Sequence, residues 1–535
     1  MMKKILLAAI PLLCSSMLTT PALADTVHAR FPKLPRHKDH VFTRMFPNLP
    51  PFAKETDLTR EAVKLLGAQG GLLDAKDNLT DPIQSIVNQP VFSPNNFDNP
   101  AMTAGVTFFG QFLDHDITLD KKSPLLENSK PRKTVNFRTA AFDLDSLYGD
   151  GPQDSPELYD PSSGYIKFIV QPIPGSELVS RHGAVRYDLQ RDANNEAIIG
   201  DSRNDENVIL SQFHLAMLRF HNAVTDYLVT QPAYRQASPQ QVFNEAQKLV
   251  RWHYQWIILH EFLPLTIGQD RLDQILSEGL QYYKIDQPEY FFQREDGSRT
   301  PRIPIEFSVA AYRFGHSQVR PSYRLNFGPT GGSPFFAFIF DDSLDPNATD
   351  PNDLRGGKRA PRRFVDWQTF FNFGDGNFRP NKIIDTKLST PLMLLPGSRA
   401  PSPGLPDDGV QSLASRNLMR HVNFGLPSGQ AIAKKMNLPA LTAAQLSELA
   451  PYSMQNSTPL WYYVLKEAEV MEHGTRMGPV GSRIVGEVFV GLMQADPGAY
   501  LSQRSNWTPT LPAAGGIGTF KMTDLLNFAG VVPPL

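Results

Sequence analysis

Cysteine is nearly absent from this chain. The one cysteine, Cys14, lies in an N-terminal segment that we expect to be removed. A mature chain without thiols can form no disulfide and has no thiolate to offer as a metal ligand or nucleophile. This excludes thiolate-ligated haem, iron–sulfur clusters and cysteine-dependent hydrolysis. Any metal chemistry must therefore use histidine and carboxylate side chains.

The chain also lacks a long uninterrupted apolar run. A basic start is followed by an apolar stretch from Ile5 to Leu13, but Pro11 and the Ser15–Ser16 pair interrupt it. A membrane-spanning helix needs roughly 18 or more consecutive apolar residues. The small residues of Ala22–Ala24 instead end the segment like the cleavage site of a secretory signal peptide. We predict a signal peptide over residues 1–24, no stable membrane anchor, and a secreted or periplasmic mature protein.

An excess of charge of either sign is missing as well. The chain has 52 Lys and Arg against 54 Asp and Glu, and loss of Lys3 and Lys4 with the signal peptide leaves 50 basic residues. This balance predicts neither nucleic acid nor an anionic membrane as a partner.

Turn-forming residues are abundant, with 37 Gly and 46 Pro, so long connections are expected. Residues 25–100 are rich in Pro, Asn and Asp, which predicts an irregular N-terminal arm. Residues 101–535 contain no repeat or linker and indicate one large, mainly α-helical domain with long loops. Apolar periodicity predicts helices over 101–119, twice between 207 and 263, and over 307–319, 431–437, 443–449, 459–473 and 479–494. A loop is expected over residues 326–363.

The segment Phe109–Asp116 places several polar groups in a short, otherwise apolar helix. Successive helix positions point about 100° apart, so His115 and its flanking carboxylates, Asp114 and Asp116, face three directions. A lone histidine in an apolar helix is usually a core residue. A carboxylate on each side favours a functional site instead.

The segment Thr139–Gly149 supplies carboxylates and hydroxyls within one turn-prone loop. Oxygen donors at this density suit calcium, which takes six to eight oxygen ligands including backbone carbonyls. The spacing is not that of an EF-hand, and a solvated acidic turn is the alternative interpretation.

Two further segments combine arginine with other polar groups. Arg203 lies within Gly200–Glu206, directly before a long helix, where the acidic residues could be favourable helix-start charges and the arginine a surface cation. In the other segment, Arg313 and His316 lie one turn apart on the same helix face. Gly315 leaves room for a flat group beside that helix.

Together and in this order, the segments resemble the animal haem peroxidases, the group that contains myeloperoxidase, lactoperoxidase and peroxinectins. The resemblance covers about residues 101–501. The matching segments are Gln111–Asp116 (distal histidine), Thr139–Gly149 (calcium loop), Asp201–Glu206 (catalytic arginine), Arg313–His316 (proximal histidine) and Asn417–Arg420 followed by Gly425–Pro427 (proximal asparagine). Five motifs in family order make chance similarity a poor explanation.

The resemblance implies haem b or an ester-modified haem, hydrogen peroxide as oxidant, and a small reducing substrate such as a halide, thiocyanate or a phenol. His115 would act as base and then acid on the peroxide. Arg203 would stabilise the charge that develops as the O–O bond breaks, on the way to a ferryl intermediate. His316 would ligate the iron, with Asn417 accepting a hydrogen bond from its other ring nitrogen.

The remaining implied haem contacts are less central to the chemistry. Arg313 would pair with a haem propionate, and Arg420 is counted with the haem-binding residues. Gln111 matches the residue that family members place near a bound halide. The positions Asp114 and Glu206 match the carboxylates that form ester links to haem in vertebrate members, so covalent attachment is a further expectation.

The resemblance also implies one calcium ion next to the distal histidine. Its expected ligands are Asp116, Thr139, the carbonyl of Ala141, Asp143 and Asp145. Asp145 stands where the family usually has serine, which adds one negative charge to the site.

Two other functions were weighed. A fatty-acid dioxygenase of the same superfamily would carry a radical-forming tyrosine at the position of Arg313, whereas Tyr312 lies one residue off that face. A peroxinectin-like adhesion protein would not need both His115 and Arg203. Four other histidines, interpreted as structural because they lie on the two long helices without such neighbours, are His214, His221, His253 and His260.

Overall fold

The computed structural model describes residues 40–86, 93–293, 299–396 and 409–534, and this part of the chain is mostly helical. The predicted signal peptide lies outside the described residues. The α-helices are α1 (Asp57–Gly67), α2 (Pro82–Ile86), α3 (Ala104–Ile117), α4 (Asp145–Tyr148), α5 (Ser176–Val179), α6 (Val208–Thr230), α7 (Pro239–Ile257), α8 (Leu263–Ile267), α9 (Gln269–Glu278), α10 (Ile305–Ser308), α11 (Leu413–Phe424), α12 (Gly429–Lys435), α13 (Leu460–Glu472), α14 (Pro479–Ala495), α15 (Tyr500–Gln503) and α16 (Met522–Phe528). Their buried apolar side chains form one connected core, which confirms the predicted single, mainly α-helical domain.

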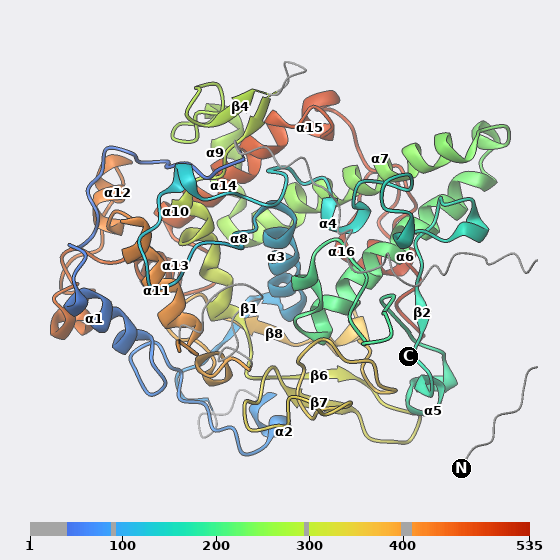
Figure 1. Ribbon diagram of the computed structural model, residues 1–535, viewed down its shortest axis with the longest axis horizontal. Helices are drawn as coiled ribbons and strands as arrows, with labels where there is room; N and C mark the ends of the chain where they lie inside the picture. Colours follow the sequence, from blue (N-terminus) through green and yellow to red (C-terminus); the bar gives the residue numbers. More distant parts are fainter. Residues whose placement is uncertain (1–39, 87–92, 294–298, 397–408, 535) are drawn as a thin grey trace, which may run out of the picture.

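The strands are short and form antiparallel pairs, two of which lie at one end of the molecule (Figure 1). The pairs are β1 (Asp98–Thr103) with β8 (Pro380–Lys382), β2 (Gln171–Pro172) with β3 (Tyr187–Asp188), β4 (Phe291–Gln293) with β5 (Arg299–Pro301), and β6 (Ser322–Asn326) with β7 (Phe335–Phe338). The β6–β7 pair corrects the expectation of a loop over residues 326–363, because Phe335–Phe338 pairs with a strand preceding that stretch.

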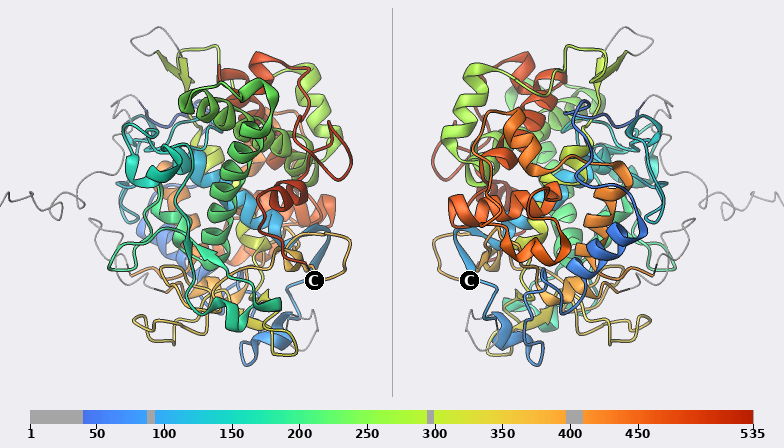
Figure 2. Two further views of the ribbon diagram at one scale, coloured as in Figure 1. Left: turned by 90° about the vertical axis from the view of Figure 1, so that its right-hand side faces the viewer. Right: turned by 90° about the vertical axis from the view of Figure 1, so that its left-hand side faces the viewer.

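Helix α3 lies near the middle of the molecule (Figure 1). It packs against α6 and against the 3₁₀-helical segment Ala311–Gln318, which follows α10. The green helices α6 and α7 and the orange helices α11 to α13 face opposite sides (Figure 2). The central helix is therefore enclosed by elements from both halves of the chain.

The two long helices follow from local signals. Asn207 caps α6 by accepting a hydrogen bond from the Leu210 amide. Ser238 and Gln241 form a capping box at the start of α7, with Pro239 at its first position. A π-helical turn over Ile258–Phe262 joins α7 to α8, so the second helix extends past the predicted limit.

Three other predicted elements differ from the structure. The helix predicted over 307–319 is split, because Ala310 has φ −133° and ψ −83°, outside the helical region. The helix predicted over 443–449 is a 3₁₀ segment, Ser447–Tyr452, which contains the non-donating Pro451. The arm predicted to be irregular contains α1, which Thr56 caps and which packs on α11.

No α-helix in the described ranges is both long and apolar enough to span a bilayer.

Candidate active site

His115 lies in the last turn of α3 and is 5% exposed. Its Nδ1 atom lies 2.9 Å from Oδ1 of Asn204. An amide oxygen can only accept, so Nδ1 carries the ring proton and Nε2 keeps its lone pair. Burial lowers the pKa of His115 to about 3, which makes the neutral ring the stable form. His115 thus has the protonation state that a general base requires.

Asn204 and His214 are neighbours of this histidine that sequence reasoning missed. The Asn204 Nδ2 atom lies 3.0 Å from Nδ1 of His214, and both residues are buried. Because an amide nitrogen only donates, His214 fixes the orientation in which Asn204 presents its oxygen to His115. His214, interpreted from the sequence as structural, thus supports the distal histidine through Asn204. Asn204 lies inside the arginine motif and could have been noticed, but no local pattern pairs it with a helix residue.

Arg203 belongs to a 3₁₀ turn, Ser202–Asp205, directly before α6. Its Nη2 atom donates to the carbonyls of His115 and Thr118, at 3.2 and 2.6 Å. Asp201 holds the same guanidinium, with Nε at 3.1 Å and Nη2 at 2.8 Å. The arginine is thus a fixed cation beside the last turn of α3, not the surface cation considered above.

Two carboxyl groups lie close to the distal histidine. Glu206 Oε1 is 4.0 Å from Nε2 of His115 and also accepts a hydrogen bond from Gln111. Asp114 accepts from the Thr118 hydroxyl at 2.9 Å. Burial raises the pKa of Glu206 to about 7 and that of Asp114 above its usual value. Both positions expected to carry ester links are therefore weakly acidic carboxyls.

His316 lies on the other side, in the segment Ala311–Gln318. Its Nδ1 atom is 2.7 Å from Nδ2 of Asn417, which projects from α11. Burial, and then the charge of Arg313, lower the pKa of His316 to about 3, so the ring is neutral. Burial thus favours the neutral imidazole, which is the protonation state that a metal ligand requires.

The amide of Asn417 is oriented opposite to expectation. Its Oδ1 accepts from Nη1 of Arg313 at 2.7 Å, so its nitrogen, not its oxygen, faces His316. The expected acceptor role would need the amide reversed, which conflicts with the arginine contact. In this arrangement Nδ1 of His316 accepts and the ring proton is on Nε2, so ligation of iron through Nε2 requires the amide of Asn417 to reverse. The carbonyl of Asn417 accepts from His421, a second buried histidine that sequence reasoning did not single out.

A cavity lies between the two histidine-bearing elements. Its lining includes Asp114 and Arg203 from the distal side and Arg313 and Arg420 from the other, with Phe42, Thr118, Leu119, Asp120, Ile305, Ser308, Val309 and Phe424. Glu206 keeps 42% of its side-chain surface accessible although protein surrounds it. A Cβ atom on Gly315 would meet no atom of the described residues within 4 Å. This space beside Gly315 fits the flat group expected there.

The cavity also has the charge to receive an acidic group. Burial lowers the pKa of Arg313 to about 10. Arg420 lies 3.7 Å from Asp120, and both line the cavity together with Arg313 and Arg203. Cationic groups at a cavity wall bind carboxylates well because they are already oriented. Two histidines, open space beside Gly315 and these arginines fit a haem with its propionates.

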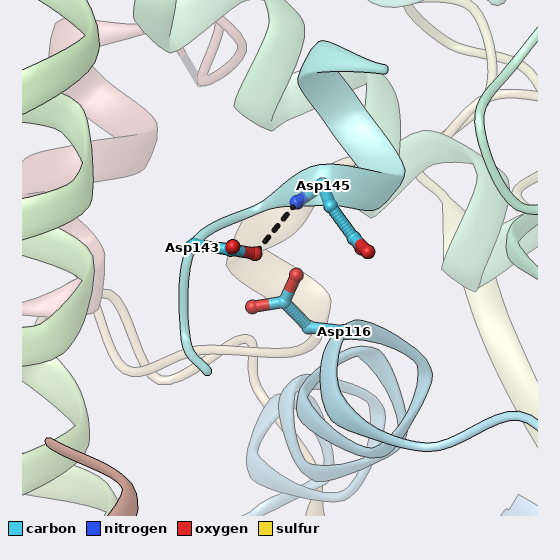
Figure 3. Close-up of side chains that lie close together, drawn as sticks. All are labelled: Asp116, Asp143 and Asp145. Atoms are coloured by element: carbon cyan, nitrogen blue, oxygen red, sulfur yellow. Dashed lines mark hydrogen bonds between the residues drawn. The ribbon is translucent and has the colours of Figure 1, made fainter. Parts of the chain in front are cut away.

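Three carboxylates converge from the end of α3, from the loop before α4 and from the first residue of α4 (Figure 3). Asp116, Asp143 and Asp145 each offer an oxygen, and these atoms lie within 4.8 Å of one another. Burial and the mutual repulsion of the group raise the pKa of Asp116 well above its usual value. Its Oδ1 is buried without a hydrogen-bond partner among the described residues. A buried carboxylate oxygen without a hydrogen-bond partner fits the role of a cation ligand.

The loop that carries two of these carboxylates is held in an unusual conformation. Leu144 lies between them with φ +60°, in the left-handed region that costs roughly 1–2 kcal/mol for such a residue. The Thr139 hydroxyl lies 2.9 Å from Asp143 and 3.2 Å from Asp145. The Thr139 hydroxyl, an expected calcium ligand, therefore lies beside the carboxylates of Asp143 and Asp145. Ala141, whose carbonyl is another expected ligand, lies in the same loop.

Comparison with known proteins identifies a family domain in the middle of the chain. Residues 120–335 match the model of the animal haem peroxidase family. This range contains Arg203 and His316, whereas His115 and Asn417 lie outside it.

Several known proteins share weak but extended sequence similarity with the chain. A peroxidase-like protein of Margaritifera margaritifera is 24% identical over 475 residues, covering 78% of this chain and 57% of that protein. Thyroid peroxidase of Homo sapiens is 23% identical over 412 residues, covering 69% of this chain and 39% of that protein. The chain thus spans little more than half the length of the first relative and less of the second.

Solved structures show the same fold at lower identity. Peroxidase A from Dictyostelium discoideum superposes with a TM-score of 0.51 at 18% identity, over 86% of this chain and 88% of that one. The fatty acid alpha-dioxygenase of Oryza sativa gives 0.52 at 12% identity, over 92% and 86%. The fold is therefore common to peroxidases and dioxygenases.

Proposed function

The chain belongs to the animal haem peroxidase family, and we propose that it is an exported haem peroxidase that uses hydrogen peroxide to oxidise small donors. The single observation that carries this proposal is the cavity that Asp114 and Arg203 share with Arg313, since the neighbouring residues of these elements include the neutral His115 and the His316–Asn417 pair. Halides, thiocyanate and phenols are the donors that we propose. Export rests on the N-terminal sequence alone.

The cofactor in this proposal is haem b or an ester-modified haem. His316 would ligate the iron, and Arg313 and Arg420 would hold the propionates. When bound, haem supplies a redox-active iron that takes oxidising equivalents from peroxide and passes them to the donor. Asp114 and Glu206 are the carboxyls that would form the ester links, and both carry raised pKa values near the cavity.

The protein's own contribution on the distal side is proton transfer and charge stabilisation. His115 takes a proton from hydrogen peroxide on Nε2 and returns it to the far oxygen, which leaves as water. The Asn204–His214 pair keeps Nε2 free for this transfer by holding the proton on Nδ1. Arg203 stabilises the negative charge on the departing oxygen, because its guanidinium is already fixed by Asp201.

Calcium is proposed at Asp116, Thr139, the carbonyl of Ala141, Asp143 and Asp145. Support comes from the convergence of three carboxylates and from the unpaired Oδ1 of Asp116. Since Asp116 is the residue after His115, a bound cation would hold the last turn of α3 in place.

The second candidate is a fatty-acid dioxygenase, which the likeness to the Oryza sativa structure favours. Against it, Arg313 stands where the radical-forming tyrosine would be. Tyr312 donates its hydroxyl proton to the Gly110 carbonyl at 3.0 Å and stacks on Phe307. We therefore favour peroxidase chemistry.

One experiment separates the two candidates. Haem-loaded protein is mixed with hydrogen peroxide and iodide, bromide, thiocyanate or a phenol, and in parallel with an unsaturated fatty acid in an oxygen electrode. Peroxide-dependent donor oxidation without oxygen uptake is expected. Rapid oxygen uptake with fatty acid and little donor oxidation would contradict the peroxidase proposal.

A further inference from the structure

A buried arginine outside the motifs considered so far lies between the candidate cation site and the distal arginine. Arg138 is 3% exposed and contacts Asp145, Asp201 and the Gly200 carbonyl. Its Nη1 atom is 2.9 Å from Oδ1 of Asp145, and its Nε atom is 2.9 Å from Oδ2 of Asp201. Its Nη2 atom donates to the Gly200 carbonyl at 2.6 Å. One side chain thus joins the loop after residue 138 to the turn that carries Arg203.

On the cation side, Arg138 acts on the residue that departs from the family pattern. Asp145 has carboxylate oxygens at 2.9 Å from Arg138 and 3.2 Å from Thr139. The extra negative charge at position 145 is therefore neutralised within the protein. A cation bound by Asp116, Asp143 and Asp145 would compete with Arg138 for the same carboxylate.

On the distal side, Arg138 acts through Asp201. The Oδ2 atom of Asp201 accepts a hydrogen bond from Nη2 of Arg203 at 2.8 Å and lies 2.9 Å from Nε of Arg138, which is an ion-pair contact without hydrogen-bond geometry. Although burial acts to raise it, the two guanidiniums hold the pKa of Asp201 below its usual range. Any movement of Arg138 toward or away from Asp145 therefore changes how firmly Asp201 holds Arg203.

We propose that Arg138 is a positioning residue that couples the candidate cation site to Arg203, through the continuous contacts Asp145–Arg138–Asp201–Arg203. A cation that binds Asp145 weakens the ion pair between Asp145 and Arg138. Arg138 then pairs more closely with Asp201. The orientation of Arg203 thus depends on occupancy of the cation site. This inference rests on the proposed function for its catalytic meaning, although the coupling itself is a property of the protein without haem.

The coupling predicts a reciprocal effect that needs no enzyme activity. If cation binding alters Arg203, then replacing Arg203 should in turn alter cation binding, because coupling between two sites acts in both directions. In Arg203→Leu, Arg138 is the one remaining arginine of this network that can pair with Asp201. We expect Arg138 to move toward Asp201 and away from Asp145. Calcium affinity should then rise by about twofold or more, the lower range for residues coupled through one network. In an Arg138→Gln background, the same Arg203 change should have no effect on affinity.

The test is a double-mutant cycle on the full-length, haem-free chain, with calcium affinity measured by competition with a fluorescent chelator. Arg251→Gln is the matched control: Arg251 donates to the Asp143 carbonyl at 2.6 Å, beside the same loop, but does not contact Asp201. Its effect on affinity should add to that of Arg203→Leu. If Arg138→Gln does not fold, Arg138→Leu with Asp145→Ser removes the pair without leaving Asp145 unpaired.

A second readout follows in the haem-loaded protein, where Arg138→Gln should slow the reaction with peroxide about tenfold while Arg251→Gln leaves it unchanged. Additive calcium affinities for the Arg138 and Arg203 changes, or no calcium binding in any variant, would overturn the inference. Lack of peroxide reaction in the unmodified protein would instead overturn the proposed function, since the affinity cycle does not depend on it.

Discussion

The two sides of the candidate haem cavity are held together by different forces. On the distal side, buried charges meet, with Asp145, Arg138, Asp201 and Arg203 in continuous contact. On the proximal side, the contacts around His316 are mostly neutral hydrogen bonds and ring packing. The Trp461 ring lies edge-on to His316 with centroids 6.5 Å apart, and its indole donates to the Arg313 carbonyl at 3.0 Å. We therefore expect salt and bound cations to alter the distal contacts. Substitutions that change side-chain packing should instead alter the proximal contacts.

The largest expected effect is loss of haem binding when the proposed iron ligand on the proximal side is removed. Replacing His316 by Ala removes the proposed iron ligand, so ordinary haem incorporation should be lost. Haem-loaded preparations are compared by their Soret absorption. His260→Ala is the control, because His260 is exposed, stacks on Trp256 and has the Tyr500 hydroxyl 3.4 Å from its Nε2 atom. An unchanged Soret band in His316→Ala would remove the assignment.

The next largest effect is a slower peroxide reaction, expected from a change on the distal side that leaves the proximal side intact. Arg203→Leu should bind haem but react with hydrogen peroxide about 10² to 10³ times more slowly, the usual cost of losing one preorganised charge-stabilising donor. Stopped-flow mixing of the ferric protein with peroxide measures this rate. A rate equal to that of the unmodified protein would show that Arg203 has no part in O–O cleavage.

A smaller effect is expected from the neutral part of the distal side. Asn204→Leu removes the acceptor that keeps the proton on Nδ1 of His115. The ring can then carry its proton on Nε2, so the peroxide reaction should slow by about 10- to 100-fold, as for other residues that orient a reacting imidazole. Asn204→Asp, which retains the acceptor oxygen, should recover part of the rate. If both variants keep the full rate, the tautomer argument is wrong.

Removal of calcium should reveal the electrostatic character of the distal side. Bound calcium stabilises the folded state by about 2.7 kcal/mol when present at 100 times its dissociation constant. Exhaustive chelation should therefore lower the melting temperature by several degrees and slow the peroxide reaction, while the Soret band persists. Asp143→Asn should show the same lowered melting temperature without chelation. Purified protein that contains no calcium and does not respond to chelators would contradict this.

The smallest expected effect concerns a carboxyl group on the proximal side. Glu467 on α13 accepts from the amides of Val480 and Gly481, and burial raises its pKa to about 8. The folded state then keeps a proton that the unfolded state loses near pH 4.5, so stability should fall as pH rises from about 4.5 to 8. Thermal unfolding at pH 6 and pH 8 should show this fall in the unmodified chain and a smaller one in Glu467→Gln. Equal slopes would show that Glu467 does not titrate in this range.

Element types were predicted well where local signals are strong, and less well elsewhere. The long helices carry apolar periodicity, capping residues and a proline at a first position, and the structure confirms them. The predicted helix over 307–319 is wrong because Ala310 adopts a non-helical conformation that divides the segment, although alanine itself favours a helix. The β7 strand was missed because a strand of four residues is recognised only through its partner.

What the sequence by itself determined is the local part of the site. His115 beside Asp116, Arg203 before a long helix, and Arg313 one turn from His316 are consequences of spacing along the chain, which a helix converts directly into direction. Carboxylates at positions 143 and 145 likewise predict a cation-binding loop before any fold is known.

Only the tertiary structure decided which groups from distant segments meet. The Asn204–His214 pair, the sharing of Asp201 by Arg138 and Arg203, and the reversed amide of Asn417 depend on how loops pack against helices. Periodicity cannot encode such contacts, because each involves the side-chain geometry of two elements whose relative position is set by burial of the whole core. The residue types of the candidate site could therefore be predicted from the sequence, whereas the contacts between its two histidines, its arginines and their partners depend on the fold.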